Sequence, residues 1–410
     1  MAQAELIAGL DMGTRKMTCL IGQVDEAGKV TVMGVGTGPS AGMRKGVVVD
    51  IEGAARAAQR VVQNAQRMAG VQVRSLYLAV TGGRITSVNN RGMVAVARAD
   101  REITREDVSR VMEAARVINV PPDFEIIHAL PRQFVVDGYD GVTDPVGMVG
   151  VRLEVEAHIV MGLVTSLENV MRSVYKAGLE VEGLVLAPLA AGEAVLQPAE
   201  RELGVVLVDV GGGTTDVALF DQGSIYFASI LPVGGDHVTS DIAVGLRTPL
   251  DVAERLKKEY GCARREQASG EVTFEVTSVG GSSQKQVDQR TLAGIVEPRV
   301  QEIFSLVGDE LAKARYNRTI PGGVVLTGGM AELEGIVELA EQVLDMPVRL
   351  GIPQGVSGLT DMVRSPAYAT AVGLLIYGAK DRALAALTKG QGGLMGSLWE
   401  RLRALFRDLF

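Results

Sequence analysis

The sequence predicts an α/β protein of two related lobes, because three pairs of similar segments recur in the same order along its 410 residues. Residues 6–14 and 205–214 each hold an apolar run that ends in Asp, Gly and Thr. Residues 76–83 resemble 324–329, and residues 188–192 resemble 366–370 more loosely, each opening a helix rich in small residues. One such pair arises easily by chance, whereas three in the same order favour a duplication.

Composition bounds the class of protein. With 47% hydrophobic and 22% charged residues the chain can bury sizeable cores, and a net charge of -8 argues against nucleic acid as a partner. Cys19 and Cys262 belong to no partner motif, which fits a reducing compartment. The longest uncharged run lies between Arg364 and Lys380; it is too short to span a bilayer and predicts a buried core helix. We therefore expect a soluble, cytoplasmic body.

The first pair of segments predicts two hairpins with glycine-rich turns. Strands are expected at 6–10 and 17–24, and again at 205–208 and 216–220. Such a turn surrounds a small concavity with backbone N–H groups, which suits phosphate, and an Asp at the strand end can hold Mg²⁺ through its water shell. The candidate phosphate and metal residues are Asp11, Gly13, Thr14, Arg15 and Lys16, and Asp209, Gly211, Gly212, Gly213, Thr214 and Thr215, with Asp11 and Asp209 as the metal-holding pair.

The two hairpins differ in how specific their sequences are. The motif that starts at Asp11 can be a tight hairpin and nothing more, whereas three consecutive glycines from Gly211 weaken a strand and need a functional reason. No Walker A sequence occurs. The glycines at 34, 36 and 38 precede no helix, so they do not predict a dinucleotide loop.

Insertions separate the paired segments. Residues 84–163 carry their own strand signals, and Thr104 followed by Asp107 predicts a helix start. Residues 248–251 open another helix, and 280–283 should form an exposed turn. The expected domains are a first-lobe core 1–83, an inserted subdomain 84–163, first-lobe core 164–196, second-lobe core 197–245, an inserted subdomain 246–299, second-lobe core 300–364, a return helix 365–387, a linker 388–393 and a terminal helix 394–410.

These motifs resemble those of a known superfamily. Residues 10–16, 208–216 and 326–330 are similar to the phosphate 1, phosphate 2 and adenosine motifs of the actin/Hsp70/sugar-kinase ATPases, and 188–196 and 366–374 to their connecting helices. Over nearly its whole length the chain resembles the FtsA family of bacterial cell-division actin homologues, a likeness that extends to 239–243, 295–299 and the final helix.

The resemblance implies a duplicated actin-like ATPase fold, with two lobes, an inserted subdomain in each, and a C-terminal amphipathic helix. It implies ATP and Mg²⁺ as ligands. Glu254, Lys257 and Lys258 share one helix face and would hold ribose and adenine, although alone this trio indicates a solvated face. The remaining implied nucleotide residues are Gly234 and Gly235 near the ribose and phosphates, and Gly328, Gly329 and Met330 beside the adenine.

One position departs from the superfamily pattern. The Hsp70 branch opens the first connecting helix with Glu-Pro, whose carboxylate helps to organise metal and attacking water, whereas this chain has Ala187 before Pro188. Hydrolysis needs a positioned water and binding does not. We therefore expect strong ATP binding and slow or conditional hydrolysis.

The C-terminal segment predicts an interfacial helix. A glycine-rich linker precedes 394–410, in which the large apolar side chains fall within about 140° of arc. The charged residues take the rest, namely Glu400, Arg401, Arg403, Arg407 and Asp408. The alternative is a terminal helix that docks on its own domain; the linker and the only Trp of the chain favour a membrane surface. The candidate membrane residues are Leu398, Trp399, Leu402, Leu405, Phe406, Leu409 and Phe410.

The resemblance implies an adaptor at the division site, on the cytoplasmic face of the cell membrane. Such a protein would polymerise head to tail, tether the FtsZ ring and recruit later division proteins. The subdomain at 246–299, with a helix beginning at Pro298, would bind the C-terminal peptide of FtsZ through Arg299, which can also be a plain surface residue. Lobe closure would turn about the helices at 188 and 366, where Gly192 and Ala369 permit close crossing. The rival hypotheses are a small-molecule kinase, a chaperone and a pilus-assembly actin homologue.

Overall fold

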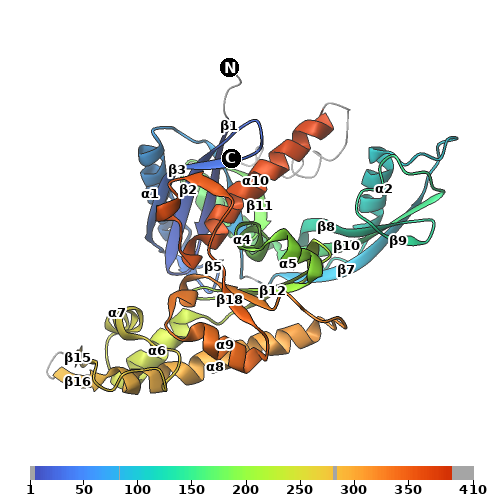
Figure 1. Ribbon diagram of the computed structural model, residues 1–410. Coiled ribbons are helices and arrows are strands. Elements are labelled where there is room, and N and C mark those ends of the chain that lie inside the picture. Colours follow the sequence, from blue (N-terminus) through green and yellow to red (C-terminus); the bar gives the residue numbers. More distant parts are fainter. Residues whose placement is uncertain (1–4, 83, 280–283, 390–410) are drawn as a thin grey trace.

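Two sheets with one shared topology organise the chain (Figure 1). The computed structural model describes residues 5–82, 84–279 and 284–389, with the backbone alone for 386–389. The first sheet has the order β11-β6-β1-β2-β3-β19 and the second the order β18-β17-β12-β13-β14. The strands of the first are β1 (Glu5–Met12), β2 (Lys16–Val24), β3 (Val30–Pro39), β6 (Ser75–Val80), β11 (Glu180–Leu186) and β19 (Val356–Gly358); those of the second are β12 (Val205–Val210), β13 (Thr215–Asp221), β14 (Ser224–Leu231), β17 (Val324–Thr327) and β18 (Val348–Leu350).

The duplication predicted from the repeated segments is confirmed strand by strand. β1 and β2 form an antiparallel hairpin, and β6 runs parallel to β1. In the second lobe β12 and β13 form the matching hairpin, and β17 runs parallel to β12. Because equivalent strands end at equivalent edges, each lobe presents its hairpin turn at the same place in its own sheet.

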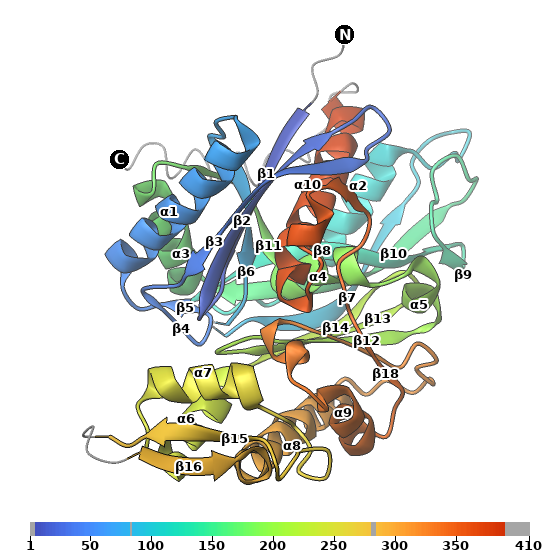
Figure 2. The ribbon, with the colours of Figure 1, turned by 60° about the vertical axis from the view of Figure 1, so that its left-hand side comes forward.

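Helices cover both faces of the first sheet (Figure 2). α1 (Ile51–Ala69) and α3 (Val164–Lys176) lie on one face, and α4 (Ala187–Val195) and α10 (Ala369–Lys389) lie on the other, between the two lobes. Gly36 lies where β3 meets α1, and a Cβ there would stand 1.8 Å from the Val61 carbonyl oxygen. The glycines of β3 therefore allow a helix to approach the sheet closely.

The second sheet is buried on both faces because α4 and α10 form a layer that both lobes share. Val205 and Leu207 point into the core of the first lobe, while Val206 and Val208 point into a separate core beneath the second sheet. This alternation is what a strand with two buried faces requires. The other elements of these regions are α5 (Pro198–Leu203), α6 (Gly235–Leu246), α8 (Gln289–Lys313), α9 (Ile336–Leu344), the short strands β4 (Met43–Arg44) and β5 (Val47–Val48), and the 3₁₀ turns at Gly329–Glu332, Thr360–Met362 and Pro366–Tyr368.

The first insertion forms a four-stranded sheet with one helix on it. Its strands are β7 (Thr86–Ala95), β10 (Arg152–Leu163), β8 (Phe124–Val136) and β9 (Tyr139–Val142) in that order, and its helix is α2 (Arg105–Ala115). The predicted helix start is confirmed: the Thr104 hydroxyl accepts from the Asp107 N–H, and the Asp107 carboxylate accepts from the Thr104 N–H at 2.9 Å.

The second insertion carries α7 (Leu250–Tyr260) and the hairpin of β15 (Thr273–Thr277) and β16 (Gln284–Asp288). The prediction that a helix begins at Pro298 is wrong, because α8 begins at Gln289 and holds Pro298 in its interior. Asp288 caps α8, since its carboxylate accepts from the N–H of Thr291 at 2.7 Å. The cap, and not the proline, therefore marks the start of this helix.

Two predictions concern parts of the chain near or beyond the described ranges. α10 ends at Lys389, so it continues past Leu387 and into the expected linker 388–393. The turn predicted at 280–283 and the terminal helix predicted at 394–410 lie outside the described residues.

Within the described ranges, no helix is both long and apolar enough to cross a bilayer.

Candidate functional site

A cleft of about 500 Å³ lies between the two lobes, a size typical of ligand sites. Both predicted hairpins open into it, together with α7, the turn after β17 and the start of α10. The predicted residues that line the cleft are Asp11, Gly13, Thr14, Arg15, Lys16, Asp209, Gly211, Gly212, Gly235, Glu254, Lys257, Lys258, Gly328, Gly329 and Met330.

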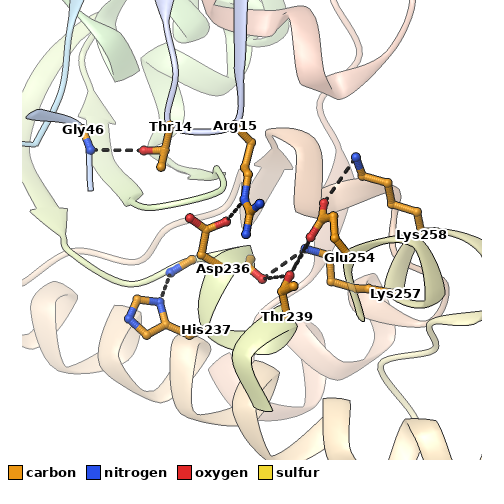
Figure 3. Close-up of polar contacts among 11 residues, drawn as sticks. Thr14, Arg15, Gly46, Asp236, His237, Thr239, Glu254, Lys257 and Lys258 are labelled. Carbon is orange, nitrogen blue, oxygen red and sulfur yellow. Dashed lines mark hydrogen bonds and ion pairs between the residues drawn. The ribbon is translucent and has the colours of Figure 1, made fainter. Parts of the chain in front are cut away.

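The two hairpin turns meet each other at glycines. A Cβ on Gly213 would stand 2.5 Å from the Thr14 hydroxyl oxygen, and one on Gly212 would stand 2.7 Å from Cγ of Arg15. The Thr14 hydroxyl also accepts from the N–H of Gly46 at 3.2 Å (Figure 3). The absence of side chains at these glycines lets the turn of the first lobe lie directly against the turn of the second.

The second hairpin is also fixed to the start of α6. The N–H groups of Gly235 and Asp236 donate to the carbonyl oxygens of Gly211 and Gly212 at 3.0 and 2.7 Å. A Cβ on Gly234 would stand 2.7 Å from the Gly211 carbonyl oxygen, so the chain can pass there only as glycine. Gly234 thus supports the turn and does not line the cleft.

Asp11 and Asp209 lie near the ends of the matching strands β1 and β12 and are half-buried. Burial, and then the charge of Asp209, raise the pKa of Asp11 to about 7, although Lys16 opposes the shift. Burial likewise raises the pKa of Asp209 to about 6, against a hydrogen bond of 3.1 Å from the Thr370 hydroxyl. Two carboxylates therefore face a common space in which neither is well solvated.

A third carboxylate, Asp216, lies behind this pair and was not predicted as a site residue. Burial, followed by the charge of Asp209, raises the pKa of Asp216 well above its ordinary value. The hydroxyl of Thr81 lies 2.7 Å from both of its carboxylate oxygens and donates to them. Asp216 is the last residue of the glycine-rich motif at 208–216, and this position in the motif could have marked it as a site residue.

This donor set suits a divalent cation held mostly through water. Mg²⁺ takes few carboxylates and keeps several waters, and a cation would favour the charged forms of Asp11 and Asp209, whose pKa values are raised. Among the described residues, no group of three or more His, Cys, Asp or Glu side chains is arranged as a metal cage.

α6 and α7 supply a buried polar network on the opposite wall (Figure 3). The Lys257 ammonium lies 2.7 Å from the Glu254 carboxylate and donates to the Gly235 carbonyl at 3.1 Å and to the Thr239 hydroxyl at 2.9 Å. Lys258 is exposed and lies 3.2 Å from the other oxygen of Glu254. The predicted trio is therefore not a solvated face, because one of its two lysines is buried in the network.

Two basic residues of the first hairpin have protein partners. Arg15 reaches across the cleft and forms an ion pair with Asp236 of the second lobe (Figure 3). The Lys16 ammonium donates to the Ala367 carbonyl at 3.1 Å and lies 3.7 Å from the ring centroid of Tyr368. Arg15 thus joins the lobes, while Lys16 joins the first hairpin to the start of α10.

The turn after β17 depends on glycine at one position. Gly328 has a φ of +88°, and a Cβ there would stand 2.3 Å from a carboxylate oxygen of Asp209. Nothing lies within 4 Å of a Cβ built on Gly329, so the backbone there is open, and Met330 is buried beside it. This combination leaves an uncrowded stretch of backbone at the cleft wall.

Some predicted residues lie elsewhere. Gly213, Thr214 and Thr215 do not line the cleft; Thr215 is fully buried, and its hydroxyl donates to the Val233 carbonyl at 2.8 Å. Lining residues that the sequence did not single out as nucleotide contacts are Glu259, Gly261, Glu332, Leu333, Glu334, Pro366, Ala367, Ala369 and Thr370.

Arg299 lies outside the cleft, in the interior of α8 and not at a helix start. Its guanidinium forms a two-pronged pair with Asp241, at 2.6 and 3.1 Å, and contacts Glu302. The glycine at which α4 and α10 approach each other closely is Gly373, and not Gly192 as expected. A Cβ on Gly192 would meet the Phe220 ring, whereas one on Gly373 would stand 1.7 Å from the Ala190 carbonyl oxygen.

Known proteins are similar to this chain over most of its length. The family described as "Cell division protein FtsA" matches residues 206–373, and the "SHS2 domain inserted in FTSA" matches residues 82–161. A cell division protein FtsA of Pseudomonas aeruginosa is 45% identical over 379 residues, which cover 92% of this chain and 90% of that protein.

Solved structures agree with the fold. A PilM-PilN type IV pilus biogenesis complex is similar with a TM-score of 0.66 at 18% identity, covering 91% of this chain and 98% of that one. MreB5 of Spiroplasma citri bound to ADP is similar with a TM-score of 0.56 at 13% identity, covering 93% and 98%. These likenesses show an actin-like ATPase fold, and the relative at 45% identity shows the narrower group: this chain belongs to the FtsA family of cell division proteins.

Proposed function

We propose that this chain binds ATP with Mg²⁺ in the interlobe cleft and acts as a nucleotide-controlled, membrane-attached polymer that tethers the FtsZ ring at the division site. The observation that carries the proposal is the contact between the two hairpin turns, with Asp11 and Asp209 beside a cleft of about 500 Å³. The ADP-bound MreB5 structure supports a nucleotide site in a related fold.

Different residues of the cleft would bind the phosphates, the ribose and the adenine. Backbone N–H groups of the two turns would hold the phosphates, and Asp11 and Asp209 would hold Mg²⁺ through water. The α7 network of Glu254 and Lys257 would hold the ribose, and the open backbone at Gly329 would lie against the adenine. Bound Mg²⁺ supplies charge neutralisation for the phosphate oxygens.

Binding and hydrolysis should separate in this protein. α4 begins with Ala187, which is buried and carries no carboxylate to position a water. We expect turnover well below the roughly 1 per second of kinases. A coupled phosphate-release assay on purified protein measures the rate, and kinase-like turnover would contradict this expectation.

Attachment to the membrane rests on the predicted helix at 394–410. Its large apolar side chains would contribute about 7 kcal/mol at roughly 1 kcal/mol each, of which helix ordering takes back a part. A single anchor is then weak, with a Kd of about tens of micromolar to millimolar. Several anchors on one head-to-tail polymer multiply through effective concentration, so polymer state controls attachment.

The same proposal assigns the FtsZ C-terminal peptide to the subdomain at 246–299. Arg299 is the residue proposed to contact the peptide. It already forms ion pairs with Asp241 and Glu302, so an acidic peptide would have to compete with these carboxylates. Recruitment of later division proteins would follow from the polymer at the division site.

Sedimentation of the full chain with and without ATP, and with and without vesicles, tests the proposal. We expect ATP to increase the pelleted fraction and vesicles to increase it further. A variant that lacks 394–410 should stay in the supernatant with vesicles yet still respond to ATP. Equal vesicle binding by the full chain and the deletion variant would refute the anchor, and no response to ATP would refute nucleotide control.

A further inference from the structure

The exposed face of α1 carries a row of arginines. Arg56, Arg60 and Arg67 are exposed and lie within about 40° of one another around the helix, spanning about 17 Å along its axis. Gln63 occupies the position between them. We refer to these three arginines as the α1 stripe.

Glu52, one helical turn before Arg56, is the only acidic residue of α1, and none follows it until Asp100. Residues 53–99 contain seven arginines and no Asp or Glu, in a chain whose net charge is -8. None of the three stripe arginines has an ion pair among the residues that the structure describes. The carboxylates of Glu52 and of Glu168 on α3 are already paired with Lys176 and Arg172. The stripe is therefore an uncompensated cationic surface.

The helices α1 and α10 end at the same edge of the first sheet. α1 ends just before β6 begins, and the last turns of α10 contact the beginning of β1, where Arg382 donates to the Leu6 carbonyl at 2.7 Å. Figure 2 shows the C-terminal ends of α1 and α10 at this same edge, on opposite faces of the sheet. Lys389, the last residue that the structure describes, therefore lies at the edge where α1 ends.

We infer that the α1 stripe is a second membrane contact that binds anionic lipid headgroups. The inference rests on the proposed membrane function and adds a lipid specificity to it. Guanidinium groups suit phosphate oxygens, and each basic residue near an anionic surface strengthens binding about fivefold at ordinary salt. The stripe would attract the first lobe to the same membrane surface that the predicted helix at 394–410 binds. This attraction requires anionic lipid.

The test compares the full chain with its Arg56→Gln/Arg60→Gln/Arg67→Gln variant in vesicle flotation. Vesicles of phosphatidylcholine alone are set against vesicles with about a third phosphatidylglycerol. We expect the variant to bind the anionic vesicles at least tenfold more weakly and the neutral vesicles as the unchanged chain does. Wild-type binding to both vesicles, or an equal loss on both, would overturn the inference.

Two control variants separate local from bulk charge. Arg91→Gln/Arg101→Gln/Arg315→Gln removes the same charge from exposed positions elsewhere and should bind anionic vesicles normally; an equal loss there would overturn the inference. Arg56→Lys/Arg60→Lys/Arg67→Lys keeps the charge and should retain most of the binding. If the lysine variant binds as poorly as the glutamine variant, the positive charge of the stripe does not attract the anionic lipid, and the inference fails.

The deletion of 394–410 keeps this inference distinct from the anchor proposal. If the deletion leaves binding unchanged while the glutamine variant loses it, the anchor fails and the stripe stands. If the deletion abolishes binding while the glutamine variant binds normally, the stripe fails and the anchor stands. Loss of poly-glutamate binding by a glutamine variant with normal vesicle binding would assign the stripe to an acidic protein and overturn the lipid assignment.

Discussion

Asp11 and Asp209 contribute to the pH dependence of stability, because burial raises the pKa of both carboxyl groups. Their pKa values in the folded protein are about 7 and about 6, against an ordinary value of 3.8. The folded state therefore holds more protons than the unfolded chain between these limits. The contribution of this pair to the free energy of unfolding is greatest below about pH 4 and falls as the pH rises to about 7.

We expect Asp11→Asn to raise the free energy of unfolding of the ligand-free protein at pH 8 by about 1–2 kcal/mol, because it removes a poorly solvated charge. At pH 5 the change should be small. Denaturant unfolding at both pH values measures this. Asp140→Asn, at an exposed position of β9, is the control and should have no effect at either pH. Destabilisation by Asp11→Asn at pH 8 would contradict the account.

Lys257 is a second charged residue whose burial predicts a measurable effect of substitution. It is buried and holds the Glu254 carboxylate together with the Gly235 carbonyl. Its removal leaves Glu254 poorly compensated inside the α7 network.

Lys257→Met should lower the free energy of unfolding by about 2–4 kcal/mol and weaken ATP binding at least tenfold. Thermal unfolding and nucleotide titration measure the two effects. Arg255→Met, on the exposed face of the same helix, should change stability by less than about 0.5 kcal/mol. Similar losses in both variants would show that the network has no special role.

The helices α4 and α10 cross in close contact at the lobe junction. Its geometry depends on Gly373, because the Ala190 carbonyl occupies the space that a Cβ would need. The sequence predicts this crossing at Gly192 and Ala369 instead, since composition marks small residues but not which of them face each other.

Gly373→Ala should lower the free energy of unfolding by about 2–3 kcal/mol, because the two helices must move apart. Gly308→Ala, inside the C-terminal part of α8, is the matched control: the nearest neighbour of the added Cβ would be 3.8 Å away, so the alanine should stabilise by about 0.5–1 kcal/mol. Denaturant unfolding of the two variants should thus give opposite signs, and equal signs would refute the packing argument.

The elements with a repeated or periodic pattern could be predicted from the sequence. Both hairpins, their parallel neighbours and the capped start of α2 are confirmed, because local residue types decide them. The start of α8 could not be placed from Pro298, since a proline fits both the first turn of a helix and, at some cost, its interior. The cap at Asp288 was the decisive local feature.

In the molecule as a whole, the lobes meet through contacts that no local pattern specifies. Arg15 pairs with Asp236, Thr370 donates to Asp209 and Thr81 donates to Asp216, each across more than a hundred residues of sequence. The glycines and carboxylates of the hairpins could be named from the sequence because their chemistry is local. Their partners depend on how α10 returns to the first lobe, and this is a property of the complete fold.

The most direct measurement is an equilibrium titration of the full chain with ATP, with and without Mg²⁺, alongside Asp11→Asn, Asp209→Asn and the control Asp140→Asn. The opposed hairpins predict that Mg²⁺ strengthens ATP binding to the unchanged chain and to the control. In the presence of Mg²⁺, Asp11→Asn and Asp209→Asn should each bind ATP at least tenfold more weakly than the unchanged chain. Equal ATP affinity in all four proteins, or no ATP binding by the unchanged chain, would contradict a nucleotide site formed by both lobes.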